Sequence, residues 1–226
     1  MVASTIVSSL DALTAELSST LGSNPEEGCI LTTSFSKEDQ VLTWAVLQTD
    51  LPVDIVSLDT GCLFPATRQT WVETEAHFGV EIRSLTPHPV DVEPLGGLSD
   101  IYVDPSARKA CCSARKILPL RRACADKEWW LTGLRKAHSP NRAGLSKVEV
   151  DDQWGLTKFH PLLDWDDATL EAAVSSTGVP VNPLYALGYA SIGCAPCTRP
   201  VLPGEDVRAG RWWWERSSKE CGLHRG

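Results

Sequence analysis

Five of the eight cysteines in this 226-residue chain stand in arrangements that favour chemistry. Cys111 and Cys112 are adjacent, Cys194 and Cys197 form a Cys-x-x-Cys pair, and Cys221 lies five residues from the end. Disulfides are rare in the cytosol, so paired cysteines there more often bind a metal or take part in catalysis. The others stand singly among apolar residues, where we expect small buried hydrophobes: Cys29, Cys62 and Cys124.

The two cysteine pairs favour an iron–sulfur cluster over a zinc ion. Side chains of adjacent helical residues point about 100° apart, so Cys111 and Cys112 are poorly placed to direct both sulfurs at one ion. A [4Fe–4S] cluster offers a separate iron to each thiolate. We therefore expect a [4Fe–4S] cluster, with zinc binding or simple burial as alternatives. Its ligands would be Cys111, Cys112, Cys194 and Cys197.

Cys221 is the candidate nucleophile, although a cysteine near a chain end is usually inert. Gly222 gives the backbone local freedom, and His224 with the basic residues nearby would favour the thiolate. A mobile terminal segment can also enter a site and leave it again.

The composition is that of an ordinary globular domain, with 42% hydrophobic and 22% charged residues. A net charge of -8 disfavours nucleic-acid binding, but it allows a local group of Arg and Lys around a small anion. No apolar run is long enough to cross a membrane, and residues 1–21 lack the pattern of a secretory signal. We expect a cytoplasmic protein that binds neither nucleic acid nor membrane.

Alternating strands and helices are expected to position these residues. Strands are expected over 28–35, 53–58, 81–85 and 129–134, and helices over 4–21, 39–48, 65–78 and 166–176. Alternation at these lengths predicts an α/β fold, with a parallel twisted sheet flanked by helices on both faces.

Three other segments complete the expected fold. A helix from about Ser106 should carry the adjacent cysteines and end or kink at Pro119. Residues 148–159 are expected to form a hairpin. Residues 87–105 contain four prolines, which indicates a surface loop and a candidate lid.

Two loops follow expected strands, at the sheet edge where α/β proteins bind ligands. In the loop 34–39, Ser36 and Asp39 could cap the next helix, or free backbone N–H groups could hold a phosphate. Both interpretations stay open. The second loop, 58–61, ends at a glycine and would lie beside the first.

These loops resemble those of the adenylyl-sulfate and phosphoadenylyl-sulfate reductase family. The sequences CCSARK (111–116), RAGRWWWE (208–215) and ECGLH (220–224) carry the same resemblance, which spans about 28–224. It implies an adenine nucleotide α-hydrolase-like fold. Residues 1–205 would form a nucleotide-binding α/β domain with the iron–sulfur site, and residues 206–226 a mobile catalytic tail.

The resemblance also implies roles for individual residues. The loop 34–39 would line the α-phosphate region, the loop 58–61 would lie near the adenosine, and Lys116 would link cluster and substrate. Arginines are the further candidates to neutralise a sulfate. The expected substrate-binding residues are Ser34, Ser36, Lys37, Glu38, Asp39, Leu58, Asp59, Gly61, Lys116, Arg135, Arg208, Arg211 and His224.

A reaction follows from the resemblance. The Cys221 thiolate would attack the sulfur of adenylyl sulfate, AMP would leave, and an S-sulfocysteine would remain. Thioredoxin or a similar thiol donor would then release sulfite, as in sulfate assimilation. The cluster is expected to keep one oxidation state. Family members are often dimers or tetramers, so a homo-oligomer is compatible with the resemblance.

Three alternatives remain. A phosphoadenylyl-sulfate or dual-specificity reductase would share the fold and the nucleophile. An adenylating ATP pyrophosphatase would share the fold, but the loop 34–39 lacks the glycines expected there. A metal-binding module without catalysis would not need Cys221.

Overall fold

The computed structural model describes residues 2–22, 28–138 and 142–215, and the described strands form one six-stranded sheet. Their order is β3-β2-β1-β4-β6-β5, and only the pairing of β5 with β6 is antiparallel. The chain order therefore reverses direction between β1 and β4, which is where open α/β sheets bind ligands. The strands are β1 (Cys29–Thr32), β2 (Val53–Leu58), β3 (Arg83–Leu85), β4 (Trp129–Leu131), β5 (Val148–Asp151) and β6 (Leu156–Phe159).

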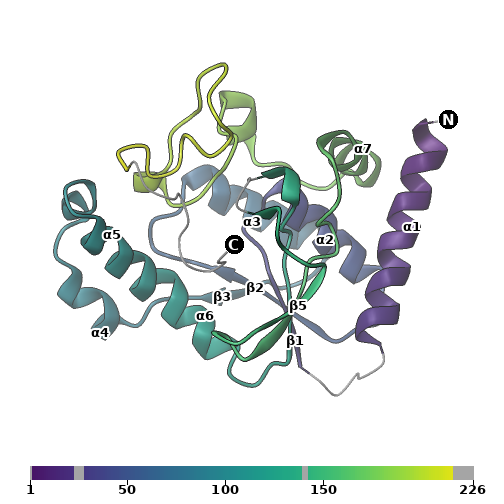
Figure 1. Ribbon diagram of the computed structural model, residues 1–226, viewed down its shortest axis with the longest axis horizontal. Coiled ribbons are helices and arrows are strands. Elements are labelled where there is room, and N and C mark those ends of the chain that lie inside the picture. Colours follow the sequence, from purple (N-terminus) through teal and green to yellow (C-terminus); the bar gives the residue numbers. More distant parts are fainter. Residues whose placement is uncertain (1, 23–27, 139–141, 216–226) are drawn as a thin grey trace.

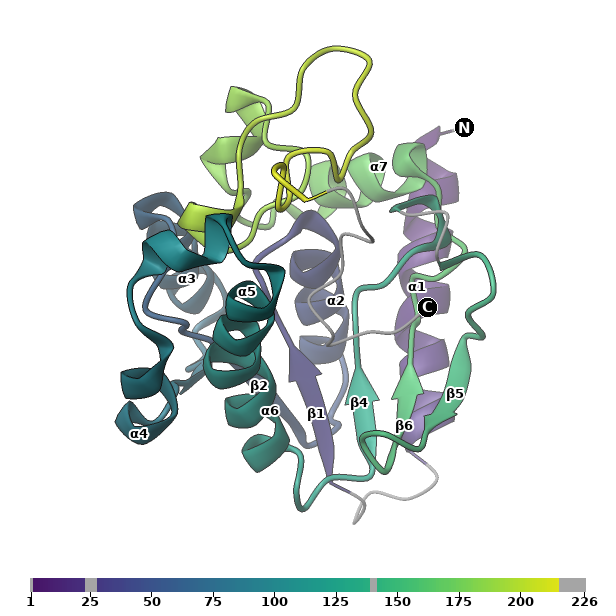
Figure 2. The same ribbon diagram turned by 60° about the vertical axis from the view of Figure 1, so that its left-hand side comes forward.

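Helices cover both faces of this sheet (Figures 1 and 2). One face carries α1 (Val2–Leu21), α2 (Lys37–Leu47), α3 (Pro65–Phe78) and α7 (Asp167–Thr177). The other carries α6 (Leu118–Ala123), with α5 (Pro105–Cys112) and α4 (Pro89–Val92) beyond it. In the described part of the chain, no helix has the length and apolar character that a membrane crossing requires.

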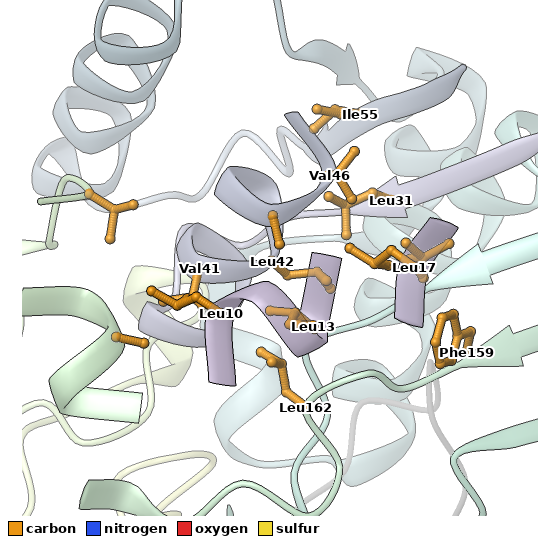
Figure 3. Packing of buried hydrophobic residues seen from close by; sticks show 14 of the residues in the cluster. Leu10, Leu13, Leu17, Leu31, Val41, Leu42, Val46, Ile55, Phe159 and Leu162 are labelled. Carbon is orange, nitrogen blue, oxygen red and sulfur yellow. The ribbon is translucent and has the colours of Figure 1, made fainter. Parts of the chain in front are cut away.

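Alternating side chains of the strands build the two hydrophobic cores. Leu31 of β1 joins the core under α1, α2 and α7, whereas its neighbour Ile30 joins the core under α6. Both are fully buried, as expected for a strand covered on both faces. In Figure 3, Leu13 and Leu17 of α1 belong to the same buried cluster as Leu42 of α2 and Leu31 of β1. The α/β fold expected from the sequence is confirmed.

Local signals set the ends of two helices. Pro65 occupies the first turn of α3, which ends at Gly79 with a φ of 67°. Asp166 caps α7 by accepting a hydrogen bond from the Thr169 N–H, and that helix ends at Gly178 with a φ of 65°. The expected boundaries of these helices, and the hairpin at 148–159, are confirmed within about one residue.

Pro119 does not end the helix that carries the adjacent cysteines. The chain continues from α5 through a π-helical segment, Ser113–Ile117, into α6, where Pro119 lies in the first turn. Proline lacks the N–H for a normal helical bond, and the wider turn accommodates this: the Leu118 N–H bonds to the Ser113 carbonyl. The widened segment carries Arg115 and Lys116.

The proline-rich segment 87–105 is more regular than the expected surface loop. It contains α4 and two short 3₁₀ helices, Glu93–Leu95 and Leu98–Tyr102. Ile101 is buried, and the Tyr102 hydroxyl donates to the Pro196 carbonyl at 2.8 Å. The segment therefore packs on the 194–197 region. Three strands are also shorter than expected, and the residues that follow β1 and β4 form loops.

We predict that Leu17→Ala destabilises the fold strongly, because Leu17 is fully buried between α1 and the sheet. The free energy of unfolding, measured with urea, should fall by about 2–5 kcal/mol. The exposed Val7 on the same helix gives a matched control, since Val7→Ala should change it by less than about 0.5 kcal/mol. Equal effects of the two substitutions would contradict the packing of α1.

Candidate functional site

A cavity of about 230 Å³ lies at the carboxyl edge of the sheet, between the loops that follow β1 and β4. In Figure 2 the strands point toward the C-terminal segment, drawn in yellow, which lies beyond this edge. Residues 190–194 and 208–212 contribute to the cavity wall. Eight of the expected substrate-binding residues line it: Ser34, Ser36, Glu38, Asp39, Leu58, Lys116, Arg208 and Arg211.

The loop after β1 folds onto itself at the start of α2. The Asp39 carboxylate accepts hydrogen bonds from the backbone N–H and the hydroxyl of Ser34, both at 2.7 Å. Ser36 caps α2 by accepting from the Asp39 N–H at 3.2 Å. Ser36 is thus a helix cap, and the same loop lines the cavity, so the two interpretations of the sequence are compatible.

Burial raises the pKa of Asp39 to about 6, although the hydrogen bonds from Ser34 oppose the shift. Desolvation disfavours a charged carboxylate, whereas donors around it favour that form. The negative charge of Asp39 beside the cavity is therefore weaker at mildly acidic pH than that of an exposed carboxylate.

Two residues of the cavity wall have strained backbones. Phe35 and Trp212 have φ angles of 60° and 41°, and no other non-glycine residue in the described ranges has a positive φ. Both are almost fully buried, so packing holds them in a conformation that costs about 1–3 kcal/mol. Strain of this kind concentrates at binding sites.

Arg135 does not line the cavity, but it contacts Glu38, which does. Its guanidinium donates to Glu38 at 2.9 Å and to Asp167 at 2.8 Å. Arg135 and Glu38 are both buried, so the pair balances a carboxylate that would otherwise be desolvated alone. Arg135 therefore links α2 to α7 through these two carboxylates, and its contact with substrate stays a prediction.

Three other expected residues also lie outside the cavity lining. Lys37 pairs with Glu171 of α7 and lies over the Tyr185 ring, with 5.1 Å between Nζ and the ring centroid. The Asp59 carboxylate forms two hydrogen bonds with Arg68 and accepts one from the Gly61 N–H. Gly61, with a φ of 71°, makes this turn possible.

Positive side chains dominate the cavity despite the net charge of -8. Lys116, Arg208 and Arg211 line it as expected, and Arg142 and His138 line it as well. Burial and the neighbouring guanidinium groups lower the pKa of His138, against the opposing charge of Glu38. Neither Arg142 nor His138 was expected from the sequence, although both follow a strand end at the correct edge. The cavity suits an anion.

Gly193 allows Arg211 to approach the backbone closely. A Cβ at Gly193 would overlap the Arg211 guanidinium, which also stacks on Trp212 at 4.7 Å from the ring centroid. The Arg211 Nη1 donates to the Ile192 carbonyl at 3.3 Å, and its Nε has no partner among the described residues. The guanidinium is therefore held against the cavity wall with one donor unused.

A second, smaller cavity adjoins the first. We call the first the anion cavity and the second the cysteine cavity. The four expected metal ligands, Cys111, Cys112, Cys194 and Cys197, all line it, and Cys62 does too. The expected burial of single cysteines is confirmed for Cys29 and Cys124 in the two main cores. Cys62 is only half-buried, and its thiol lies beside other thiols.

Three of these cysteines have a cationic partner. Arg115 hydrogen-bonds Cys111, Arg108 hydrogen-bonds Cys112, and Lys116 hydrogen-bonds Cys194. Burial raises the pKa of Cys194, but Lys116 and a contact with the Thr60 hydroxyl at 3.3 Å outweigh it, so the pKa lies below its ordinary value. Positive charge beside a thiol favours the thiolate that iron binds, but burial still raises the pKa of Cys111, and that of Cys197 to about 12.

The five thiols of this cavity are a donor set that iron accepts, and the cluster itself stays a prediction. No group of three or more His, Cys, Asp or Glu in residues 2–22, 28–138 and 142–215 is arranged to hold a metal ion. The free volume between the cysteines is about 20 Å³, so a cluster would require other thiol rotamers. Trp212 and Arg115 line this cavity, and Trp212 Nε1 and Arg115 Nε have no partner among the described residues; cluster sulfides accept donors of this kind.

The two cavities share one wall. Lys116, Cys194 and Trp212 line both of them, so a side chain that faces the anion cavity also contacts the cysteines. Lys116 is placed there by the π-helical segment and Cys194 by the loop that precedes the 3₁₀ helix Ala195–Cys197.

The C-terminal segment is anchored beside this wall. The carboxylate of Glu215 accepts two hydrogen bonds from Arg108, both at 2.8 Å, and both side chains are buried. Residues 206–215 therefore pack against the rest of the chain. Cys221 and His224 lie outside the described residues, and the expected boundary at 205/206 stays a prediction.

Comparison with known proteins identifies the family of this chain. Residues 28–200 match the phosphoadenosine phosphosulfate reductase domain. The chain belongs to this family. A protein of Agrobacterium fabrum named adenosine 5′-phosphosulfate reductase is 47% identical over 199 residues, 86% of this chain and 76% of that protein. One of Burkholderia cepacia with the same name is 43% identical over 96% of this chain and 87% of its own.

Solved structures agree with the fold. Phosphoadenylyl-sulfate reductase from Candida auris, in a phosphate complex, aligns with a TM-score of 0.65 and 27% identity, over 82% of this chain and 94% of that one. FMN adenylyltransferase from Candida glabrata aligns with a TM-score of 0.59 but only 14% identity, over 93% and 73% of the chains. The second likeness concerns the fold alone.

We predict that Arg108→Met destabilises the chain by about 3–5 kcal/mol, because it leaves the Glu215 carboxylate buried without its partner. Arg108→Met/Glu215→Leu should recover most of that loss, since it removes both charges. Arg122→Met is the control: this arginine pairs with Asp91 at the surface and should contribute less than about 1 kcal/mol. Urea unfolding measures all of these; equal losses for Arg108→Met and Arg122→Met would contradict the anchor.

Proposed function

We propose that this enzyme reduces adenylyl sulfate to sulfite and AMP, with Cys221 as nucleophile and an S-sulfocysteine as intermediate. The observation that carries the proposal is the wall of Lys116, Cys194 and Trp212, which places a cationic cavity directly beside the cysteines. The name of the relatives, adenosine 5′-phosphosulfate reductase, supports the same substrate.

The cavity offers a place for each part of this nucleotide. Backbone N–H groups at the start of α2, in the loop 34–39, suit the phosphate. Apolar side chains of Val56, Leu58 and Leu63 offer a surface for the adenine. The sulfate would lie toward the cations of the lining, which are Lys116, Arg142, Arg208 and Arg211.

The first step transfers the sulfonate to the enzyme. The Cys221 thiolate forms a bond to the sulfate sulfur, and the bond from that sulfur to the bridging phosphate oxygen breaks. AMP leaves with the electron pair of the broken bond. Cations around the sulfate lower the barrier, because they neutralise charge on the crowded anion and on the leaving phosphate.

The second step returns the enzyme to its thiol form. A dithiol donor such as thioredoxin attacks Cys221 Sγ, and sulfite leaves with the electron pair of the S–S bond. The second thiol of the donor then attacks the mixed disulfide, releases Cys221 and closes the donor's own disulfide. The donor thus supplies two electrons. We propose a cytoplasmic location, where thiols are kept reduced.

We also propose that Cys111, Cys112, Cys194 and Cys197 hold a [4Fe–4S] cluster. Support comes from the shared cavity of the four thiols, the cationic partners of Cys111, Cys112 and Cys194, and the unpaired donors of Trp212 and Arg115. A bound cluster supplies an electrostatic field beside the anion cavity. Lys116, which faces both cavities, would hold the sulfate close to that field.

Intact-protein mass spectrometry tests this function. After anaerobic incubation with adenylyl sulfate and no thiol, the wild type should gain the mass of one sulfonate group, and Cys221→Ser should not. Cys124→Ser, in a core away from both cavities, should behave as the wild type.

Other results of this experiment would favour a different substrate, a different nucleophile or a different function. A faster adduct with phosphoadenylyl sulfate would favour the phosphoadenylyl-sulfate or dual-specificity reductase. An adduct that persists in Cys221→Ser would exclude Cys221 as the nucleophile. No adduct with either nucleotide, in protein that carries its metal centre, would favour an adenylating enzyme or a metal-binding module.

A further inference from the structure

Cys62 lies at the cysteine cavity without belonging to either of the paired motifs. It follows β2 in the turn 59–62 and lines the same small cavity as the four expected ligands. Five thiols therefore gather where a cluster needs four.

Backbone and side-chain contacts place Cys62 directly beside Cys194. The Cys62 carbonyl accepts a hydrogen bond from the N–H of Ala195 at 2.8 Å. The Thr60 hydroxyl accepts from the Cys62 N–H at 3.2 Å and contacts the Cys194 sulfur at 3.3 Å. Two separate links thus join the turn after β2 to the segment that carries Cys194.

The other ligands lack such a link to Cys62. Cys111 and Cys112 end α5, and Cys197 is buried in its 3₁₀ helix beside Trp212. Arg115 donates to the Thr60 carbonyl at 2.9 Å, which ties the turn to the π-helical segment through a cation and not through a thiol. Cys62 is therefore best placed to substitute for Cys194.

Unpaired donors give an independent sign that the cavity receives an acceptor. Trp212 is 1% exposed, lines the cavity, and has no partner for Nε1 within the described ranges. The Nε of Arg115, another residue of this wall, also has no partner in those ranges. Buried donors without a partner are costly, so a ligand rich in acceptors is expected here.

We propose that Cys62 is a fifth thiol of the cluster site, able to bind the iron that Cys194 holds. In this exchange Cys62 loses a proton and its thiolate binds the iron, while the released Cys194 thiolate takes up a proton; no electron is transferred. The inference rests on the proposed cluster. The site would then keep its cluster when Cys194 is lost, because the Cys62 thiol lies beside it and can replace it as a ligand.

Iron and sulfide analysis of anaerobically purified variants tests the exchange. Cys194→Ala should keep its iron and acid-labile sulfide because Cys62 replaces the missing ligand. Cys194→Ala/Cys62→Ala should lose both. Cys194→Ala/Cys124→Ala is the matched control, since Cys124 lies in another core, and it should retain what Cys194→Ala retains. Cys62→Ala alone should keep the wild-type content.

Alkylation followed by peptide mass spectrometry gives a second readout that does not depend on activity. In Cys194→Ala, Cys62 should be protected while iron is bound and should react once a chelator removes it. Circular dichroism of each variant shows whether it is folded, so a loss of iron in an unfolded variant is recognised.

Two outcomes would overturn the inference in distinguishable ways. Wild-type protein that contains zinc or no iron would remove the proposed cluster, and the inference with it. Wild-type protein with iron, together with equal iron in Cys194→Ala and in Cys194→Ala/Cys62→Ala, would overturn the role of Cys62 alone. Reactive Cys62 in iron-loaded Cys194→Ala would also contradict it.

Discussion

The contact between Lys116 and Cys194 is the interaction on which the arrangement of the two cavities depends. Lys116 lines the anion cavity and hydrogen-bonds a thiol of the cysteine cavity, so one cation serves both. The π-helical segment places this lysine, because the wider turn accommodates Pro119 without ending the helix. The strained backbone of Trp212 completes the same wall. Favourable packing of the buried Trp212 side chain offsets the cost of that strain.

Charge pairing explains how an acidic chain presents a cationic cavity. Glu38 reaches the cavity wall, but Arg135 neutralises it from behind and ties α2 to α7. Burial raises the pKa of Asp39 to about 6, so this second carboxylate loses its negative charge at a higher pH than an exposed one does. The carboxylate of Glu215 is similarly occupied by Arg108 beside Cys112. Acidic groups near the site are thus paired or desolvated, while lysine and arginine line the cavity.

The sequence predicted what short-range signals determine. Pro65 with Gly79 and Asp166 with Gly178 mark helix ends locally, and strand–helix alternation indicated the α/β fold. The paired cysteines indicated one site, and they share one cavity. What depends on distant contacts was missed: Cys62 was expected to be buried but is half-buried beside other thiols, and Arg142 and His138 were not expected in the cavity. Cys221 and His224 lie beyond the described residues, so their roles stay predictions.

Mössbauer spectroscopy of protein reconstituted with enriched iron tests the shared wall most directly. If Lys116 and Cys194 join the two cavities, saturating adenylyl sulfate should change the signal of one iron site of the proposed cluster, whereas adenosine, which lacks phosphate and sulfate, should not. A spectrum that adenylyl sulfate leaves unchanged, in protein shown to bind it, would contradict the coupling between the anion cavity and the cysteines.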